Sequence, residues 1–74
     1  MRTVRVARDG EGPTLQAALQ LAGLAQTGGQ AKQLIQAGAV TVNGQVEQRR
    51  SHRLQAGDVV ACQGDEVELA ADDR

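Results

Sequence analysis

The sequence predicts an α+β fold in which two short helices pack together and strands cover their shared apolar face. Two segments in the first half of the chain carry apolar residues at helical spacing, each with a capping residue before it and a glycine after it. The dipeptide Asn43-Gly44 between two short apolar runs then signals a β-hairpin, because both turn residues need a positive φ. With 74 residues, the chain is expected to form one domain over residues 1–74, with a modest core.

The first predicted elements are a strand and a helix. Residues 3–6 alternate polar and apolar side chains, which is typical of a half-buried strand, and a turn-rich connector follows at residues 9–13. Thr14 then caps a helix that Gly23 ends, and its apolar face is formed by Leu15, Ala18, Leu19 and Ala22. A bend at residues 25–26 leads into the second helix. Neither helix is long enough to be stable alone, so the two are expected to pack against each other.

The second helix is expected to begin after Thr27, which is a good N-cap. Gln30, three residues later, completes a capping box in which each side chain satisfies a backbone N–H group. Gly38 ends the helix, whose apolar face is formed by Ala31, Leu34 and Ile35.

Two glycines in the first turn of this helix, Gly28 and Gly29, need an explanation of their own, because they weaken the helix. They leave the first N–H groups unscreened by side chains, which together with the helix dipole suits a phosphate. Alternatively, they let the preceding bend approach the first helix closely. Both interpretations stay open, and the nearby Lys32 favours the phosphate.

The second half of the chain predicts strands at residues 40–42, 45–47, 59–61 and 67–69. A turn at Gly64-Asp65 separates the last two, and the acidic tail at residues 70–74 is expected to fray. Residues 48–53 are polar throughout and are expected to form an exposed loop or extended arm. Leu54 then returns to the core, and residues 55–58 make a turn.

Charge is unevenly distributed along the chain, although the net charge is only −1. Between residues 32 and 53 the basic residues Lys32, Arg49, Arg50 and Arg53 outnumber the acidic Glu47, whereas residues 58–74 are acidic. Such a local basic patch sets the local field even when the whole chain is acidic. The three arginines can fork onto phosphate oxygens. The alternative is a solvated charged loop, but acidic residues are not interleaved among the arginines, which favours a binding surface.

The composition argues against several classes of function. The chain has no Phe, Tyr or Trp, so it offers no aromatic platform on which single-stranded bases could stack. Cys62 and His52, the only cysteine and histidine, cannot build a zinc site, and no nucleotide-binding glycine pattern is present. Cys62 is expected to be a buried apolar residue and His52 a polar loop residue. We therefore expect no enzyme activity, no cofactor and no metal. With no signal peptide and no membrane span in the sequence, the expected location is the cytoplasm.

The order of these elements resembles the S-four RNA-binding domain, which is named for ribosomal small-subunit protein four. In particular, the chain is similar to the short, stand-alone bacterial members of that family, of the YbcJ type. The resemblance covers roughly residues 13–69 and is carried by Thr27-Gly28-Gly29-Gln30-Ala31-Lys32, Ile35, Gly38, Val40, Val42-Asn43-Gly44, Glu47, Arg49-Arg50, Leu54 and Gly57-Asp58.

The resemblance implies a fold and a surface. The fold is two packed helices against a small, mostly antiparallel sheet, the αL-like motif. The RNA-facing surface is formed by residues 27–33 and 49–53, which here supply Thr27, Gly28, Gly29, Gln30, Lys32, Gln33, Arg49, Arg50, His52 and Arg53. Asn43 is expected to add a hydrogen bond to a sugar or base edge. Many members carry an arginine just after the capping residue, where this chain has Gly28, so its backbone amides are expected to do more of the binding.

The leading hypothesis is a non-catalytic, ribosome-associated protein that recognises structured RNA, ribosomal or transfer RNA, mainly through phosphates. Its larger partner would be a ribosomal subunit or its precursor. A second hypothesis is a protein-interaction module that uses the acidic residues Asp58, Asp65, Glu66, Glu68, Asp72 and Asp73. A third is a regulatory fragment whose basic loop contacts nucleotides.

Overall fold

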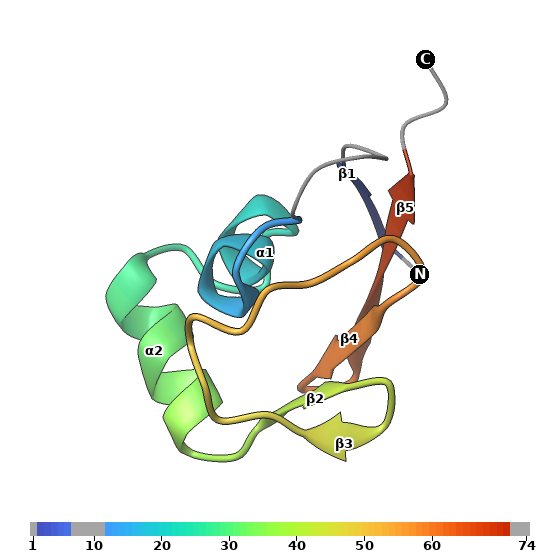
Figure 1. The fold of residues 1–74 in the computed structure, drawn as a ribbon. Coiled ribbons are helices and arrows are strands. Elements are labelled where there is room, and N and C mark those ends of the chain that lie inside the picture. The colour runs from blue at the N-terminus through green and yellow to red at the C-terminus, as the bar shows by residue number, and fades with distance from the viewer. Residues whose placement is uncertain (1, 7–11, 72–74) are drawn as a thin grey trace.

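The computed structural model describes residues 2–6 and 12–71 and confirms the α+β fold class. Two helices lie on one side of a five-stranded sheet (Figure 1). In chain order the elements are β1 (Arg2–Val6), α1 (Leu15–Leu21), α2 (Gly28–Gln36), β2 (Val40–Val42), β3 (Gln45–Val46), β4 (Val59–Cys62) and β5 (Asp65–Ala71). Of the predicted connector at residues 9–13, residues 9–11 lie outside the described part of the chain.

The sheet is mostly antiparallel, as the resemblance implied, but the first and last strands, β1 and β5, form a parallel pair. The strand order is β1-β5-β4-β2-β3. Three neighbouring pairs are antiparallel: β5 with β4, β4 with β2, and β2 with β3. The fourth pair, β1 with β5, is parallel. β5 is therefore an interior strand, and β1 and β3 are the two edges.

Each helix begins at a threonine and ends at a glycine, as predicted. Thr14 Oγ1 accepts a hydrogen bond from the Ala17 N–H at 3.1 Å in α1. Gly23 and Gly38 follow the two helices, each with φ of 77°, which is the left-handed conformation that glycine adopts without strain. After α2, the N–H of Ala39 donates to the carbonyl of Leu34 at 3.1 Å, which completes the expected C-terminal cap.

The hairpin turns are formed by residues with positive φ. Asn43 and Gly44 have φ of 52° and 86°, so the predicted Asn-Gly turn is confirmed. The second turn was predicted one residue too late: it is formed by Gln63 and Gly64, at 52° and 85°, and Asp65 already begins β5.

The prediction of a frayed tail from residue 70 was also wrong in part, because β5 runs to Ala71. Ala70 and Ala71 pair with Arg5 and Val6 of β1, so their backbones belong to the sheet. Residues 72–74 lie outside the described part of the chain.

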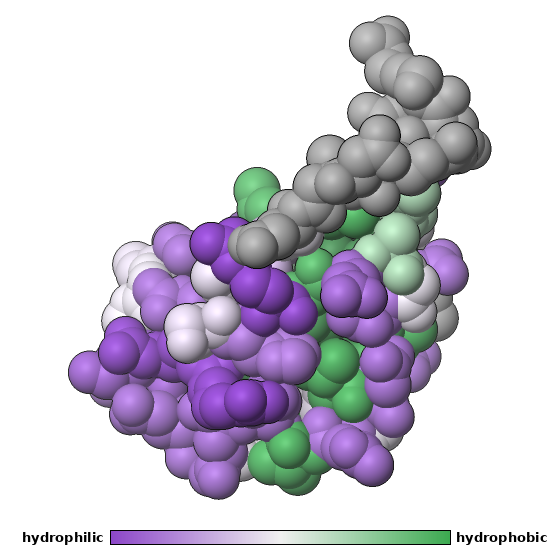
Figure 2. Space-filling view, viewed as in Figure 1, coloured by the Kyte–Doolittle hydropathy of each residue, from purple (hydrophilic) through white to green (hydrophobic). Residues whose placement is uncertain are grey.

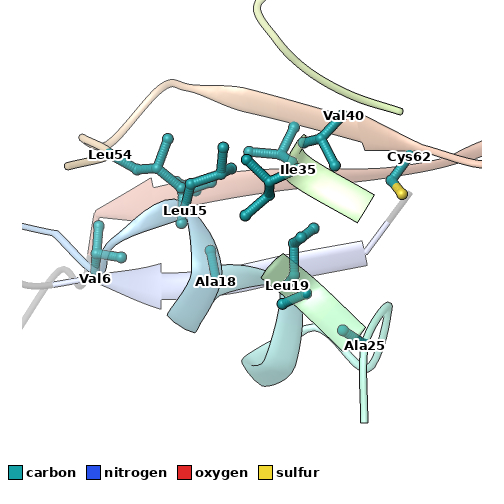
Figure 3. Close-up of a cluster of buried hydrophobic side chains, with 12 residues drawn as sticks. Val6, Leu15, Ala18, Leu19, Ala25, Ile35, Val40, Leu54 and Cys62 are labelled. Carbon is teal, nitrogen blue, oxygen red and sulfur yellow. The ribbon is translucent and has the colours of Figure 1, made fainter. Parts of the chain in front are cut away.

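The core is aliphatic and lies between the helices and the sheet. Leu15 and Leu19 of α1, Ile35 of α2 and Leu54 are fully buried. Figure 3 shows these side chains gathered with Val40 of β2. Leu54 follows the polar residues 48–53, so its burial anchors the end of that segment, as predicted. Neither helix of the described chain has the length and apolar character needed to cross a membrane.

Candidate nucleic-acid interface

Two side-chain hydrogen bonds, one made by Thr27 and one by Gln30, cap the start of α2. Thr27 Oγ1 accepts a hydrogen bond from the Gln30 N–H at 3.0 Å, as a capping box requires. The return bond goes one residue further back than predicted, because Gln30 Oε1 accepts from the N–H of Gln26 at 2.7 Å. Within the described part of the chain, the N–H groups of Gly28 and Gly29 donate to no acceptor. They are the orphan donors that every helix start leaves to water, a side chain or a ligand.

The two glycines of this turn have different surroundings. A Cβ placed on Gly28 would come within 2.7 Å of Gln16 Nε2 in α1, so the absence of a side chain there allows the two helices to approach. A Cβ on Gly29 would meet only Thr27 Oγ1, at 4.0 Å, and Gly29 is exposed. The close-approach interpretation therefore applies to Gly28, whereas packing gives no reason for Gly29.

The basic arm, residues 48–53, is not a free loop. Its backbone carbonyls accept hydrogen bonds from the first turn of α1: Arg50 accepts from the Gln16 N–H at 3.3 Å and His52 from the Leu15 N–H at 2.8 Å. These bonds satisfy donors that the helix start would otherwise leave without a partner. The arm is thus held in place by main-chain bonds, and in Figure 1 it passes beside both helices.

Both ends of the basic arm are fixed as well. At its start, Gln48 Nε2 donates to the carbonyl of Gln36, the last residue of α2, at 3.1 Å. At its end, Arg53 forms an isolated bridge with Thr14 and its Nη1 donates to the carbonyl of Gly12 at 3.1 Å. The arm therefore runs from the C-terminal end of α2 to the N-terminal end of α1.

Gln16 connects the basic arm to the start of α2. Its backbone N–H binds the Arg50 carbonyl, and its side-chain amide lies against Gly28. An open hollow of about 470 Å³ lies here, lined by Thr14, Gln16, Arg49, Arg50 and Ser51. Lys32 follows Gly28 by one helical turn, on the same side of α2. The most hydrophilic residues on the face in Figure 2 gather over α2 and the arm.

Glu47 and Arg49 form an ion pair at the start of the arm. Arg49 Nε lies 3.0 Å from Glu47 Oε2, and Arg49 Nη2 lies 3.2 Å from Oε1. Hydrogen bonds from the Arg49 side chain and backbone lower the pKa of Glu47 to about 2, and the same pairing raises the pKa of Arg49. His52 Nδ1 lies 3.6 Å from Glu47 Oε1. Arg49 is therefore part of the basic surface while its guanidinium stays paired with Glu47.

The comparisons with known proteins fall on this same region. A family model described as the S4 domain matches residues 6–70, which include both helices and the whole basic arm. The chain belongs to the S4 domain family. Among curated proteins, no sequence matches the chain.

A solved structure resembles the S4 domain described here over nearly its full length. It is the solution structure of YbcJ from E. coli, which is described as revealing an αL motif involved in RNA binding. The two proteins are 34% identical, the match covers 96% of this chain and 89% of YbcJ, and the TM-score is 0.75. Both the recognition of the family and the two-helix fold that it implied are thereby confirmed.

Two cations of this S4 domain are available for binding. The side chains of Arg50 and Lys32 are exposed and make no hydrogen bond or ion pair with another described residue. Arg53 differs from them because its guanidinium already binds the Gly12 carbonyl. Gln33 is exposed on α2.

Asn43 has a structural role that the sequence did not indicate. Its Nδ2 donates to Asp58 Oδ1 at 3.0 Å, and its Oδ1 accepts from the Val59 N–H at 2.9 Å. The side-chain amide therefore ties the first hairpin turn to the start of β4.

Cys62 and the described acidic side chains other than Glu47 lie outside the basic surface. Cys62 is 3% exposed, as expected of a small core residue, and burial, followed by the charge of Asp65, raises the pKa of its thiol. Within residues 2–6 and 12–71, no group of three His, Cys, Asp or Glu side chains is placed to hold a metal ion.

Two residues of this candidate interface were missed at the level of sequence. Gln16 belongs to the predicted first helix, and nothing local indicates that it touches both Gly28 and the arm. Glu47 was counted as a lone acidic residue, although Glu-x-Arg in an extended segment places the two side chains on the same side. That spacing was the available signal for the ion pair.

Proposed function

We propose that this S4 domain is a non-catalytic protein that binds structured RNA, mainly through its phosphates. Membership of the S4 family and the likeness to YbcJ support RNA binding. The observation that carries the proposal is the position of Gln16, which contacts both Gly28 and the arm. One continuous surface then offers the unpaired N–H groups of α2, Lys32 and the arginines of the arm to neighbouring phosphates.

The chemistry of this surface favours the shape of an RNA over its base sequence. The chain has no aromatic side chain to stack on unpaired bases, so it is poorly suited to single strands. Amide groups at a helix start and guanidinium groups bind phosphate oxygens. We take ribosomal or transfer RNA as the bound class from the family resemblance, and a ribosomal subunit or its precursor, in the cytoplasm, would supply the rest of a larger interface.

The remaining predicted residues have assigned parts in this proposal. Thr27 and Gln30 fix the first turn of α2 through their capping hydrogen bonds. Gln33 and His52 add hydrogen bonds at the edge of the surface. Arg53 contributes positive charge at the end of the arm. Asn43 acts by holding the hairpin in place, so we assign it no phosphate. With 3 to 5 phosphates neutralised, log K should fall against log salt concentration with a slope of about −3 to −4.

Charge reversal at Arg50 tests the proposal. Arg50→Glu should weaken binding to a transfer RNA and to a ribosomal RNA hairpin by about tenfold or more at low salt, since it removes an exposed cation and adds an anion. The matched control is Arg5→Glu, which makes the same change on β1 at the opposite edge of the sheet. Unchanged affinity of Arg50→Glu for both RNAs would show that the proposal is wrong. Crosslinking in cells, followed by sequencing of the bound RNA, would identify the natural partner.

The second hypothesis, a protein-docking acidic surface, now rests on fewer residues. Asp58 is engaged with Asn43 and with the N–H of Gln55, at 3.0 and 2.8 Å, so its carboxylate is already used. Glu66 and Glu68 remain exposed on β5, opposite the buried Val67 and Leu69. Neutralising Asp65, Glu66 and Glu68 should leave RNA affinity unchanged; loss of a protein partner from that variant would favour this alternative.

A further inference from the structure

The carboxylate of Glu47 binds mainly to one residue. It accepts three hydrogen bonds from Arg49: from the backbone N–H at 3.0 Å, from Nε at 3.0 Å and from Nη2 at 3.2 Å. The first of these fixes the backbone at the start of the basic arm, and the other two fix the plane of the guanidinium. A single acidic side chain thus orders both the main chain and the side chain of Arg49.

Glu47 lies beneath Arg49. The side chain of Glu47 is 16% exposed, whereas that of Arg49 is 74% exposed. The backbone N–H of Glu47 donates to the carbonyl of Val40 at 3.1 Å, so Glu47 is anchored to the sheet at β2. The positive end of the pair therefore faces solvent, and the negative end is turned toward the protein.

The pairing leaves part of the guanidinium open. Arginine has five N–H donors, of which Nε and one of Nη2 bind Glu47. His52 Nδ1 lies 3.5 Å from Nη2. The two N–H groups of Nη1 make no hydrogen bond within the described part of the chain. Arg49 lines both the hollow that contains Arg50 and Gln16 and a second hollow that contains Glu47 and His52, so it borders the surface that carries Arg50.

We propose that Glu47 is a positioning residue of the RNA interface: it holds Arg49 so that the Nη1 edge of the guanidinium meets an RNA phosphate. Fixing a long side chain in advance removes much of the conformational entropy that binding would otherwise cost. The inference rests on the proposed RNA-binding function. It adds to the RNA-binding surface one residue, Glu47, whose charge is negative like that of the RNA phosphates. A carboxylate near a phosphate should by itself weaken binding, so charge alone predicts that removing Glu47 raises RNA affinity. Positioning predicts that removing Glu47 lowers RNA affinity.

The test compares Glu47→Gln with Glu68→Gln. Each variant removes one negative charge, but Glu68 is exposed on β5, away from the basic arm. Affinity for a ribosomal RNA hairpin would be measured at fixed salt by fluorescence anisotropy. Positioning predicts that Glu47→Gln binds about three- to tenfold more weakly than the unmodified protein, while Glu68→Gln binds equally or slightly more tightly. If Glu47→Gln binds as tightly as Glu68→Gln, Glu47 acts only as a charge and the proposal is overturned.

A second measurement separates positioning from a general loss of structure. In the Arg49→Ala background there is no guanidinium to position, so adding Glu47→Gln should no longer weaken binding and should slightly strengthen it. An equal loss in both backgrounds would mean that Glu47 supports the fold and not Arg49. Amide spectra of each variant show whether the fold is retained.

Failure of the inference can be told apart from failure of the proposed function. If the unmodified protein binds no structured RNA, or Arg50→Glu binds as well as it does, the RNA-binding proposal falls and this inference falls with it. If the unmodified protein binds and Arg50→Glu does not, only the behaviour of Glu47→Gln decides about Glu47. The Arg49 Nε–H resonance gives a readout that needs no RNA: it should be protected from exchange in the unmodified protein and lose that protection in Glu47→Gln.

Discussion

Asn43 and Asp58, fifteen residues apart in the sequence, are joined by a hydrogen bond of 3.0 Å from Nδ2 to Oδ1. Asn43 Oδ1 also accepts from the N–H of Val59, while the other oxygen of Asp58 accepts from the N–H of Gln55. One amide and one carboxylate thus link the first hairpin turn, the 55–58 turn and the start of β4. Both sides of the basic arm are consequently fixed to the same strand.

Replacing Asn43 by glycine tests this link. Glycine accepts the φ of 52° at this position, so the turn is kept, the side-chain hydrogen bonds are lost, and the unfolded chain gains some conformational freedom. We expect the free energy of unfolding to fall by about 1–2 kcal/mol, measured by urea denaturation. If Asn43 has only this structural role, RNA affinity measured well below the unfolding midpoint should stay the same. A variant that is equally stable but binds RNA more weakly would assign Asn43 to the RNA contact instead.

Gly29→Ala should separate stability from binding. A Cβ at Gly29 has room, and alanine favours a helix over glycine by about 0.5–1 kcal/mol, so the thermal midpoint should rise. The added methyl group shields the orphan N–H groups, so RNA affinity should fall. Gly28→Ala is the matched comparison, and it should gain less stability because Gln16 Nε2 must move from 2.7 Å. Unchanged RNA affinity in Gly29→Ala would remove the helix start from the binding surface.

Thr27→Ala should shorten or fray the first turn of α2. Its Oγ1 satisfies the N–H of Gln30, and loss of such a cap costs about 1 kcal/mol. Thr27→Ser keeps the oxygen and should restore most of that stability in denaturant titrations. Equal losses for the two variants would attribute the effect to the methyl group of Thr27 and not to capping.

The Glu47–Arg49 pair predicts a pH dependence at low pH. The pKa of Glu47 falls from 4.5 to about 2 on folding, so its contribution to stability is fully present above about pH 5. That contribution is lost as the pH falls from 4.5 through about 2, where the folded protein also takes up the proton. The difference in unfolding free energy between the unmodified protein and Glu47→Gln should therefore be constant near neutral pH and vanish toward pH 2. A difference that is as large at pH 2 as at neutral pH would contradict the ion pair.

Local chemistry made the two helices and the first hairpin turn predictable. Thr14, Thr27, Gly23 and Gly38 act within a few residues of themselves, and Asn43-Gly44 specifies its turn by φ alone. The basic surface was likewise visible as a cluster of charges, because the arginines lie close together in the sequence.

What the sequence did not reveal depends on contacts between distant residues. The carbonyls of Arg50 and His52 bind the start of α1 through the main chain, which leaves no trace in side-chain type. The parallel pairing of β1 with β5 joins Arg2 to Val67, and no turn or spacing encodes such a pair. Gln16 became a candidate for the interface only once α1, α2 and the arm were brought together.

The position of β5 between β1 and β4 has a consequence for how the molecule is made. β1 is synthesised well before β5 and has no neighbour in the sheet until residues 65–71 follow. Contacts this distant in sequence slow folding, because the intervening chain must be ordered first. The helices share their core with the sheet, so they reach full stability only when β5 lies between β1 and β4. An RNA surface built on that sheet would thus become rigid only after residues 65–71 have been made and have paired with β1 and β4.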